Sequence, residues 1–283
     1  MPAFTRMQTT DLDSELAAVL RCVRSAPGRI SVLSAADPGK RGRSALRIDL
    51  EDGTTVKVRR LESAEAAMGL VRAREALDAT YSRVLGWSGA AIVEEWIAGT
   101  PLDELGADGS HTAAAGLVLG RLHAARGHGE ESAATTPFCE AALADLQACV
   151  SEGVLDPDEH QGLVALVHAS DPGRTALTLT HRDFCAENIL VEESGTLRVV
   201  DNEWFAVGPP GFDLGRTRAR WPMSADSWAR FLAAYRTVSA IDDLSLRFWS
   251  VAAAAWTLRL RLGREPASFE QPLCLLRSLE RGL

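Results

Sequence analysis

The sequence predicts an α+β protein, with a small sheet-rich lobe over residues 1–96 and a larger, mainly helical lobe over residues 97–283. Two patterns lead to this prediction. Before residue 97, apolar residues alternate with polar ones in several short segments, which is typical of strands. From residue 112 onward, apolar residues recur mostly at helical spacing, and the stretch at about 94–100 is expected to be the hinge that connects the lobes.

The first lobe is expected to consist mostly of strands. In chain order, the expected elements are a helix at 11–25, strands at 30–33, 45–50 and 54–59, a helix at 63–79, and strands at 83–85 and 91–96. Asp52-Gly53 is a dipeptide typical of a hairpin turn, and Ser63 is placed to open the second helix. In the strand at 54–59, Lys57 points away from the face of its two neighbouring valines.

The second lobe begins where the pattern becomes helical, after Gly99-Thr100-Pro101. The expected elements are helices at 112–125, 139–150 and 156–169, short strands at 177–180, 189–192 and 197–200, and about three helices within 224–282. Acidic residues in the first turn of the helix at 156–169 favour a helix start there, because they oppose the positive end of the helix dipole.

The composition is that of a globular protein, with 46% hydrophobic and 24% charged residues. The longest apolar run, at about 251–258, is far shorter than the roughly 20 residues that span a bilayer. Acidic residues interrupt the N-terminal stretch, so neither a membrane anchor nor a signal peptide is expected. Five cysteines without a CxxC pair favour the cytoplasm, and the formal net charge of -8 argues against nucleic-acid binding.

Charge is distributed unevenly along the chain. Residues 140–203 contain thirteen acidic residues and three arginines, whereas residues 204–283 contain eleven arginines and seven acidic residues. The first stretch favours a cationic substrate and the second disfavours a polycation, so the two offset each other. Only two of the thirty basic residues are lysines, and Lys57, inside a strand pattern, suggests that a compact ammonium is needed there.

The segment 181–188 reads His-Arg-Asp-Phe-Cys-Ala-Glu-Asn and matches the pattern H-R-D-x-x-x-x-N in full. Asp201 follows Asn188 by thirteen positions, and a turn at 193–195 between two strands would bring these residues close together. Their carboxylate and amide suit a hard, oxygen-seeking Mg²⁺. Asp183 is placed to accept the proton of an attacking hydroxyl. A metal, a cation and such a carboxylate are the parts that phosphoryl transfer needs.

Over about residues 28–260 the sequence resembles the aminoglycoside phosphotransferase and choline kinase family, whose members are relatives of the protein kinases. The resemblance rests on six matches in the family's order, each weak alone: Val56-Lys57-Val58, the hinge-like stretch 93–102, Leu-Gly-Arg-Leu-His at 119–123, the loop at 181–188, Asp201, and Gly-Phe-Asp-Leu at 211–214. It implies a protein-kinase-like fold and a small-molecule kinase.

The resemblance also implies roles for residues of the first lobe. Lys57 would contact the α- and β-phosphates of ATP. A glutamate of the following helix would hold Lys57, with Glu75 preferred and Glu65 as the alternative. The carbonyl of Glu95 and the amide of Ile97 would bind adenine.

For the second lobe, the resemblance implies that Asp183 is the catalytic base and that Asn188 and Asp201 bind Mg²⁺. Asp213 is expected to bond to the backbone of the catalytic loop. The sequence departs from the family at Arg182, where the family commonly has Gly.

The expected function is transfer of the γ-phosphoryl group from ATP, or GTP, to a hydroxyl of a small molecule. An aminoglycoside or other antibiotic, choline or another amino alcohol, and a sugar all stay open as the acceptor, with Trp204 as a candidate contact. A protein kinase is disfavoured, because Cys185 stands where Ser/Thr kinases carry Lys and no Asp-Phe-Gly follows. An inactive binding module is disfavoured because the catalytic, metal and phosphate residues are all present. The oligomeric state is not predicted.

Overall fold

The computed structural model of the protein describes residues 6–7, 14, 18, 20–23, 26–34, 44–75, 77–106, 109–125, 132–263 and 269–282. The chain forms two compact units, Met1–Gly99 with Leu190–Glu203, and Thr100–Ile189 with Trp204–Leu283. The first unit thus includes a later segment that the continuous ranges expected from the sequence assign to the second lobe. The α+β fold class is confirmed, with a sheet early in the chain and mostly helices after it.

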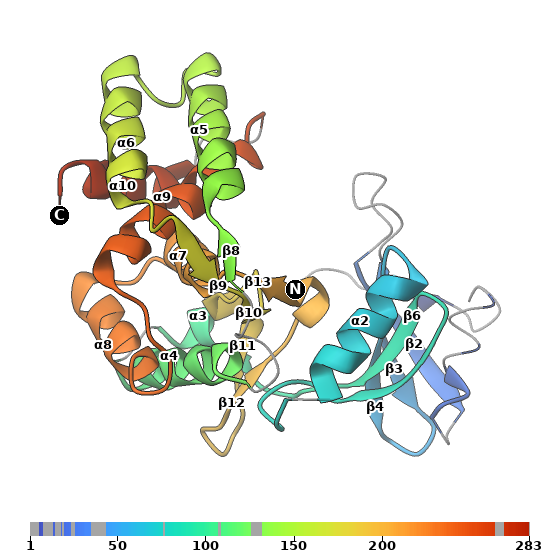
Figure 1. Cartoon of the computed structure of the whole chain (residues 1–283). Coiled ribbons are helices and arrows are strands. Elements are labelled where there is room, and N and C mark those ends of the chain that lie inside the picture. The colour runs from blue at the N-terminus through green and yellow to red at the C-terminus, as the bar shows by residue number, and fades with distance from the viewer. Residues whose placement is uncertain are drawn as a thin grey trace. The chain divides into compact units, whose positions relative to one another are not determined.

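The first unit contains a six-stranded antiparallel sheet with the strand order β1-β2-β3-β4-β6-β5 (Figure 1). Its strands are β1 (Arg6–Met7), β2 (Pro27–Ser34), β3 (Ser44–Leu50), β4 (Thr55–Arg60), β5 (Val84–Ser88) and β6 (Ala91–Glu95). The expected hairpin joins β3 to β4, and Gly53 in its turn has a φ of 85°, which residues with a side chain rarely adopt. The helix expected at 11–25 lies largely outside the described residues.

The two faces of β4 have different surroundings. Val56 and Val58 are fully buried in an apolar core with side chains of β2, β3 and β6, among them Ile30, Leu46, Ile48 and Val93. Lys57 and Arg59 lie on the opposite face, because side chains alternate along a strand. The register pairs Lys57 with Glu94 of β6, so these charged residues share one face of the sheet.

Helix α2 (Ala64–Glu75) packs against β5 and β6 (Figure 1). The hydroxyl of Ser63 accepts a hydrogen bond from the amide of Ala66 at 3.1 Å, which confirms the expected helix start. The helix ends four residues earlier than expected. Shortly after it, the carboxylate of Asp78 accepts a hydrogen bond from the amide of Thr80 at 2.8 Å, and this local turn competes with a further helical turn.

The later segment of the first unit contains the turn between β11 (Ile189–Val191) and β12 (Leu197–Val199), which neighbour each other in one sheet. Gly195 in this turn has a φ of 82°, in agreement with the turn expected at 193–195. The amide of Val199 donates a hydrogen bond of 2.7 Å to the carbonyl of Thr80, so β12 is tied to the loop that follows α2.

The second unit is mainly helical. Its helices are α3 (Leu102–Leu105), α4 (Gly109–His123), α5 (Thr136–Ser151), α6 (Pro157–Ser170), α7 (Pro210–Arg220), α8 (Ala225–Tyr235), α9 (Asp243–Arg259) and α10 (Glu270–Glu280), with the short helices η3 (Ala186–Asn188) and η4 (Asn202–Trp204) at or near unit boundaries. Its strands are β7 (Thr100–Pro101), β8 (Ser132–Ala134), β9 (Arg174–Ala176), β10 (Thr178–Thr180) and β13 (Ala206–Gly208). No helix among the described residues has the length and apolarity needed to cross a membrane.

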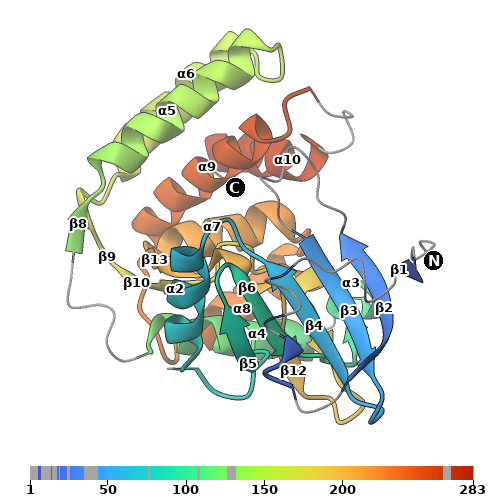
Figure 2. The same cartoon turned by 90° about the vertical axis from the view of Figure 1, so that its right-hand side faces the viewer.

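Helix α9 forms the core of the second unit, where α5, α7 and α10 pack against it (Figure 2). Helix α7 lies close to α9 because two of its residues in contact are glycines. A methyl group on Gly211 would come within 2.1 Å of the Trp249 ring, and one on Gly215 within 2.3 Å of the Trp249 carbonyl oxygen. This close packing fixes the helix that carries several residues of the candidate site.

The sequence patterns do not predict helix α7. Its buried side chains include Asp213, Arg216 and Thr217, so apolar residues do not repeat along it at helical spacing. The local signal that it does carry is Pro210 in the first turn, where proline is favoured because that amide has no partner within the helix.

Candidate active site

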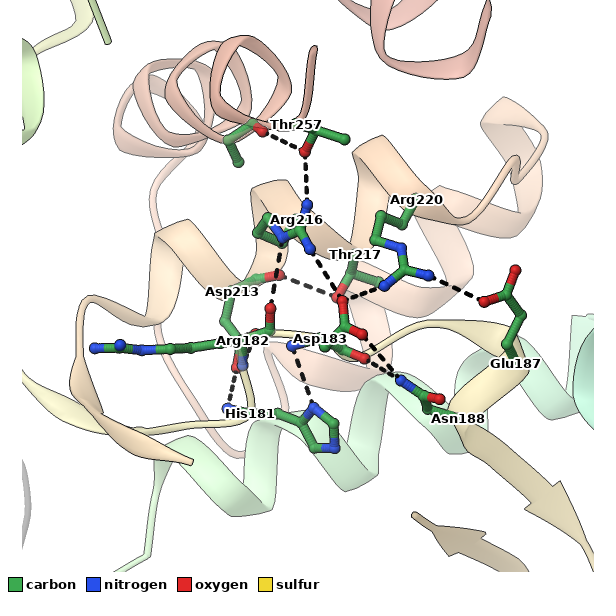
Figure 3. A network of polar contacts seen from close by, with 11 residues as sticks. His181, Arg182, Asp183, Glu187, Asn188, Asp213, Arg216, Thr217, Arg220 and Thr257 are labelled. Atoms are coloured by element: carbon green, nitrogen blue, oxygen red, sulfur yellow. Dashed lines mark hydrogen bonds and ion pairs between the residues drawn. The ribbon is translucent and has the colours of Figure 1, made fainter. Parts of the chain in front are cut away.

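The catalytic loop follows β10 and reaches η3, and the buried carboxylate of Asp213 on α7 fixes its backbone. Asp213 accepts hydrogen bonds from the amide of His181 at 2.7 Å and from the amide of Arg182 at 2.8 Å (Figure 3). Arg182 has a φ of 64°, a left-handed conformation that costs free energy in a residue with a side chain. The role expected for Asp213 is confirmed, because its carboxylate holds the loop in this strained shape.

Asp213 is ionised in the interior of the second unit. Its side chain is fully buried and lies 3.1 Å from Nε2 of His123, whose Nδ1 lies 2.9 Å from the hydroxyl of Tyr235. Burial alone raises the pKa of Asp213, but the hydrogen bond to His123 and the charges and amides around it bring the pKa below its ordinary value.

Asp183 lies at the centre of a polar network (Figure 3). Its Oδ1 forms ion pairs with Arg216, at 3.0 Å, and with Arg220. The amide nitrogen of Asn188 donates to the carbonyl oxygen of Asp183 at 2.9 Å and to Oδ2 at 3.3 Å. The amide of Asp183 donates to Nδ1 of His181 at 3.2 Å. The structure therefore brings together Asp183 and Asn188, and it fixes the orientation of the carboxylate.

The two arginines that contact Asp183 differ in their surroundings. Arg216 is buried, donates to the hydroxyl of Thr257 at 2.7 Å, and lies over the ring of Trp256 at 4.5 Å from its centre. Burial lowers the pKa of Arg216 to about 10, even though Asp183 opposes that shift. The side chain of Arg220 is 21% exposed and also pairs with Glu187 at 3.0 Å, so its contacts are with carboxylates. The sequence did not predict either arginine as a site residue, since α7 itself was not predicted.

In the first unit, Lys57 and Asp201 are brought together. Nζ of Lys57 lies 3.1 Å from Oδ1 of Asp201, and the guanidinium of Arg59 lies 3.6 Å from the same oxygen. Asp201 has a φ of 61°, the second left-handed residue with a side chain among the described residues. Strained residues of this kind gather at functional sites. Of the two among the described residues, Arg182 precedes Asp183 and Asp201 is itself a predicted site residue.

The glutamates expected to hold Lys57 lie elsewhere. Glu75 is exposed at the end of α2, and Glu65 is exposed in its first turn. Among the described residues, neither glutamate lies within ion-pair distance of Lys57. The buried carboxylate on this side of the sheet belongs to Glu94, which lies 2.8 Å from Nε of Arg59. Sequence reasoning missed both members of that pair.

The hinge residues Glu95 and Ile97 lie at the end of β6. The carboxylate of Glu95 accepts a hydrogen bond from the amide of Arg83 at 2.8 Å and forms an ion pair with Arg198 at 2.6 Å. Residues 96–99 leave regular structure, so their main-chain groups are not part of the sheet ladder. Ile97 is buried. Adenine binding by these two residues stays a prediction.

Glu75 and Glu95 also line a pocket of about 630 Å³ in the first unit, together with Arg74, Tyr81, Arg198 and nearby residues of β5. The pocket mixes acidic, basic and aromatic side chains, and Arg74 lies over the ring of Tyr81 at 5.2 Å. Lys57 and Asp201 do not line it, so this pocket and the predicted phosphate residues are separate features.

Trp204 and Cys185 differ in how far their side chains are exposed. Trp204 is 44% exposed, whereas Trp221, Trp228 and Trp249 are buried and serve packing. Cys185 is buried within the catalytic loop, and burial raises the pKa of its thiol to about 12, so it stays protonated and is a poor nucleophile.

The predicted metal ligands, Asp201 and Asn188, match only part of what a Mg²⁺ site needs. Among the described residues, no group of three or more His, Cys, Asp or Glu side chains is arranged to hold a metal ion. Mg²⁺ is commonly held by one or two carboxylates together with substrate phosphates. Asp201 suits this kind of binding, because its carboxylate side chain is 42% exposed. The side-chain nitrogen of Asn188 donates to Asp183, so the side-chain oxygen of Asn188 points away from Asp183.

Residues 41–249 match the model of the phosphotransferase enzyme family, which covers most of the chain. The chain belongs to this family, and it is a phosphotransferase that acts on small molecules with a hydroxyl group. The family expected from the sequence motifs is thus confirmed.

Solved structures with the same fold have low sequence identity to the chain. A protein from Thermobifida fusca with a provisional assignment as a fructosamine-3-kinase is 17% identical with a TM-score of 0.63, over 95% of this chain and 99% of that one. A spectinomycin phosphotransferase solved with ADP and spectinomycin is 11% identical with a TM-score of 0.65, over 95% and 99%. A choline/ethanolamine kinase family protein from Mesorhizobium loti is 19% identical with a TM-score of 0.61, over 93% and 92%. No curated protein sequence matches the chain significantly.

Proposed function

We propose that the protein transfers the γ-phosphoryl group of ATP to a hydroxyl of a small molecule, with Asp183 as the catalytic base. The observation that carries this proposal is the fixed catalytic loop, in which Asp213 holds the backbone and Asp183 is oriented by Asn188 and Arg216. A nucleotide is further supported by the ADP present in the spectinomycin phosphotransferase of the same fold. GTP stays an alternative donor.

In the proposed reaction, the acceptor oxygen forms a bond to the γ-phosphorus while the bond between that phosphorus and the β,γ-bridging oxygen breaks. The proton of the acceptor hydroxyl passes to the carboxylate of Asp183. Because Arg216 and Asn188 fix this carboxylate on both oxygens, it is oriented before the acceptor binds. Arg220 is a partly exposed cation at the same carboxylate and is placed to offset negative charge that develops during transfer.

Most of the residues proposed to bind the nucleotide belong to the first unit. Lys57 is proposed to contact the α- and β-phosphates, and Asp201 and Asn188 to hold Mg²⁺, which supplies positive charge to the phosphate oxygens when it is bound. The carbonyl of Glu95 and the amide of Ile97 are proposed to bind adenine. The ion pair between Lys57 and Asp201 supports this assignment, because the proposed phosphate-binding cation and the proposed metal-binding carboxylate lie 3.1 Å apart.

The identity of the acceptor is the finer part of the proposal. An antibiotic, an amino alcohol and a sugar each remain candidates, and an antibiotic acceptor would make the protein a resistance enzyme. The exposed ring of Trp204 supports a contact to the acceptor. We place the reaction in the cytoplasm, where ATP is available and the five free cysteines stay reduced. Neither a nucleic acid nor a membrane is part of the proposal.

A thermal-shift series tests the proposal. The protein is heated with ATP or GTP, each with and without Mg²⁺, and then with a non-hydrolysable ATP analogue plus an aminoglycoside, choline or an amino sugar. Ligands that bind the folded state raise its melting temperature by mass action. We expect a shift by nucleotide that depends on Mg²⁺ and a further shift by one acceptor class, with phosphorylation of that acceptor. The absence of any nucleotide shift at millimolar concentration would contradict the proposal.

A further inference from the structure

Two cations of β4 approach the same oxygen in the first unit. Lys57 lies 3.1 Å from Oδ1 of Asp201, and Arg59 lies 3.6 Å from that atom. The same guanidinium nitrogen of Arg59 lies 3.2 Å from the carboxylate of Glu203. Arg59 therefore bridges two acidic residues of the later segment, one of which is the proposed metal ligand.

Arg59 is itself held by a buried carboxylate, that of Glu94. Its Nε lies 2.8 Å from Oε2 of Glu94, and the side chains of this pair are only 2% and 0% exposed. The other oxygen of Glu94 accepts a hydrogen bond of 3.2 Å from the hydroxyl of Ser82. That hydroxyl accepts one of 3.2 Å from the side-chain amide of Asn202, the residue after Asp201. The side chains of both Asp201 and Asn202 are thus connected to Glu94, through Arg59 and Ser82 respectively.

A buried ion pair of this kind is not explained by stability. Removing two charges from water costs several kcal/mol for each ion, and apolar residues of similar volume often serve a core equally well. An arginine is required if several acceptors must be bound at once, because its planar fork offers donors in fixed directions, whereas a lysine offers one compact charge. Arg59 forms ion pairs with three carboxylates, and the contact with Glu203 also has hydrogen-bond geometry.

We propose that Arg59 is a positioning residue for Asp201 and that Glu94 of β6 fixes Arg59 for this task. The carboxylate that orders the phosphate and metal residues thus comes from the sheet, whereas the sequence led us to expect a glutamate of helix α2. The inference rests on the proposed role of Asp201 as a metal ligand. Partners that orient metal ligands typically change metal affinity by about 10- to 100-fold when they are lost.

The test replaces the whole pair, with the double variant Arg59→Met/Glu94→Leu. Because both charges leave together, neither member of the pair is left buried without the other. Glu94 also faces the buried Arg74, so the melting temperature of the variant is measured first, to select the folded protein for the binding experiment. Calorimetry with a non-hydrolysable ATP analogue then measures nucleotide affinity with and without Mg²⁺. We expect the gain in affinity due to Mg²⁺ to fall by about 10-fold or more. The control is Arg259→Met/Asp145→Leu, which carries the same two substitution types at an ion pair of 2.7 Å between α9 and α5, in the second unit, where only the carboxylate is buried.

The outcomes separate the inference from the proposed function. If the unchanged protein shows no Mg²⁺-dependent nucleotide binding, the proposed function fails and the inference fails with it. If the unchanged protein shows that dependence and the double variant shows it equally, Arg59 is not a positioning residue, while the proposed function stands. If the double variant does not fold, Arg59→Lys decides the question. That variant keeps the charge but not the fork, and it is expected to lose Mg²⁺-dependent affinity, whereas unchanged affinity would overturn the inference.

Discussion

Two carboxylates that are proposed to act in one reaction are held in different ways. Asp201 in the first unit is contacted by Lys57 and Arg59 of β4, and the anchor of Arg59 is another carboxylate, Glu94, deep in the unit. Asp183 in the second unit is contacted by Arg216 and Arg220 of α7.

The two arginines that contact Asp183 are themselves held by different kinds of group. Arg216 is fixed by a neutral hydroxyl and an aromatic ring, whereas Arg220 is anchored by a second, exposed carboxylate, that of Glu187. The two carboxylates thus differ in what anchors their buried arginine. For Asp201, the proposed metal ligand, it is the buried carboxylate of Glu94, and for Asp183, the proposed base, it is a neutral hydroxyl and an aromatic ring. Four substitutions test this difference, from the largest expected effect to the smallest.

The largest effect is expected for Asp183→Ala. Loss of the base should lower kcat by about 10³-fold, in the usual range for general base catalysis. Nucleotide affinity should stay within a few-fold, because Asp183 acts on the acceptor hydroxyl. Turnover by ADP release and nucleotide binding by calorimetry check the two parts separately. Activity close to that of the unchanged protein would remove Asp183 from the role of base.

The next effect is on stability, for Asp213→Asn. The variant loses the charge that receives two loop amides and faces His123, which should cost about 3 kcal/mol at neutral pH. The pKa of Asp213 is lowered in the folded protein, so its contribution is complete above its unfolded pKa of about 3.9 and is lost as the pH falls through the folded pKa. Denaturant titrations at several pH values should show the difference between the two proteins shrinking below about pH 4. A difference that does not change with pH would mean that Asp213 is not ionised in the folded state.

A smaller effect is expected for Asp201→Ala, and it concerns binding. The proposed metal ligand is lost, so the affinity for Mg²⁺ with ATP should fall by about 100-fold, whereas affinity for ATP without Mg²⁺ should change little. Calorimetry with and without Mg²⁺ measures this difference. The same Mg²⁺ dependence in both proteins would show that Asp201 is not a metal ligand.

The smallest effect is expected for Arg220→Ala. Because its side chain is partly exposed and its partners are carboxylates, the variant should fold normally and lose about tenfold in kcat, the worth of a hydrogen bond to a charged group. Addition of guanidinium to the assay should restore part of the loss. Arg230→Ala on α8 is a suitable control. Among the described residues, the ion-pair partner of Arg230 is Asp226, and both side chains are exposed. Equal kcat for the two variants would reduce Arg220 to a surface residue.

Much of the fold follows from local patterns. The hairpin at Gly53 and the start of α2 at Ser63 were predicted from turn and capping residues. The start of α6 is confirmed in more detail, because Asp156 and Glu159 form a reciprocal cap. Such signals are legible because both partners of the interaction lie within a few residues of each other.

Two features could not be predicted from local sequence patterns: helix α7 and the ion-pair partner of Lys57. The helix buries Asp213 and Arg216, so it lacks the apolar repeat by which helices are found in a sequence. The partner of Lys57 among the described residues is Asp201, 144 positions away along the chain, and neither glutamate of α2 takes that place. Glu75 was expected to hold Lys57 because of the family resemblance. Such a resemblance does not specify which carboxylate lies nearest to the lysine in this chain.

The sequence by itself determined the fold class and the family, and its ordered series of short motifs led to the roles proposed for Lys57, Asp183, Asn188 and Asp201. Only the tertiary structure decided which charges contact them. Arg59, Glu94, Arg216 and Arg220 lie on elements far from their partners in the sequence, and an arginine or a glutamate in a strand or helix looks the same in a sequence whether it is solvated or buried. Burial, which sets the strength and the cost of each charge, arises only when the elements pack together.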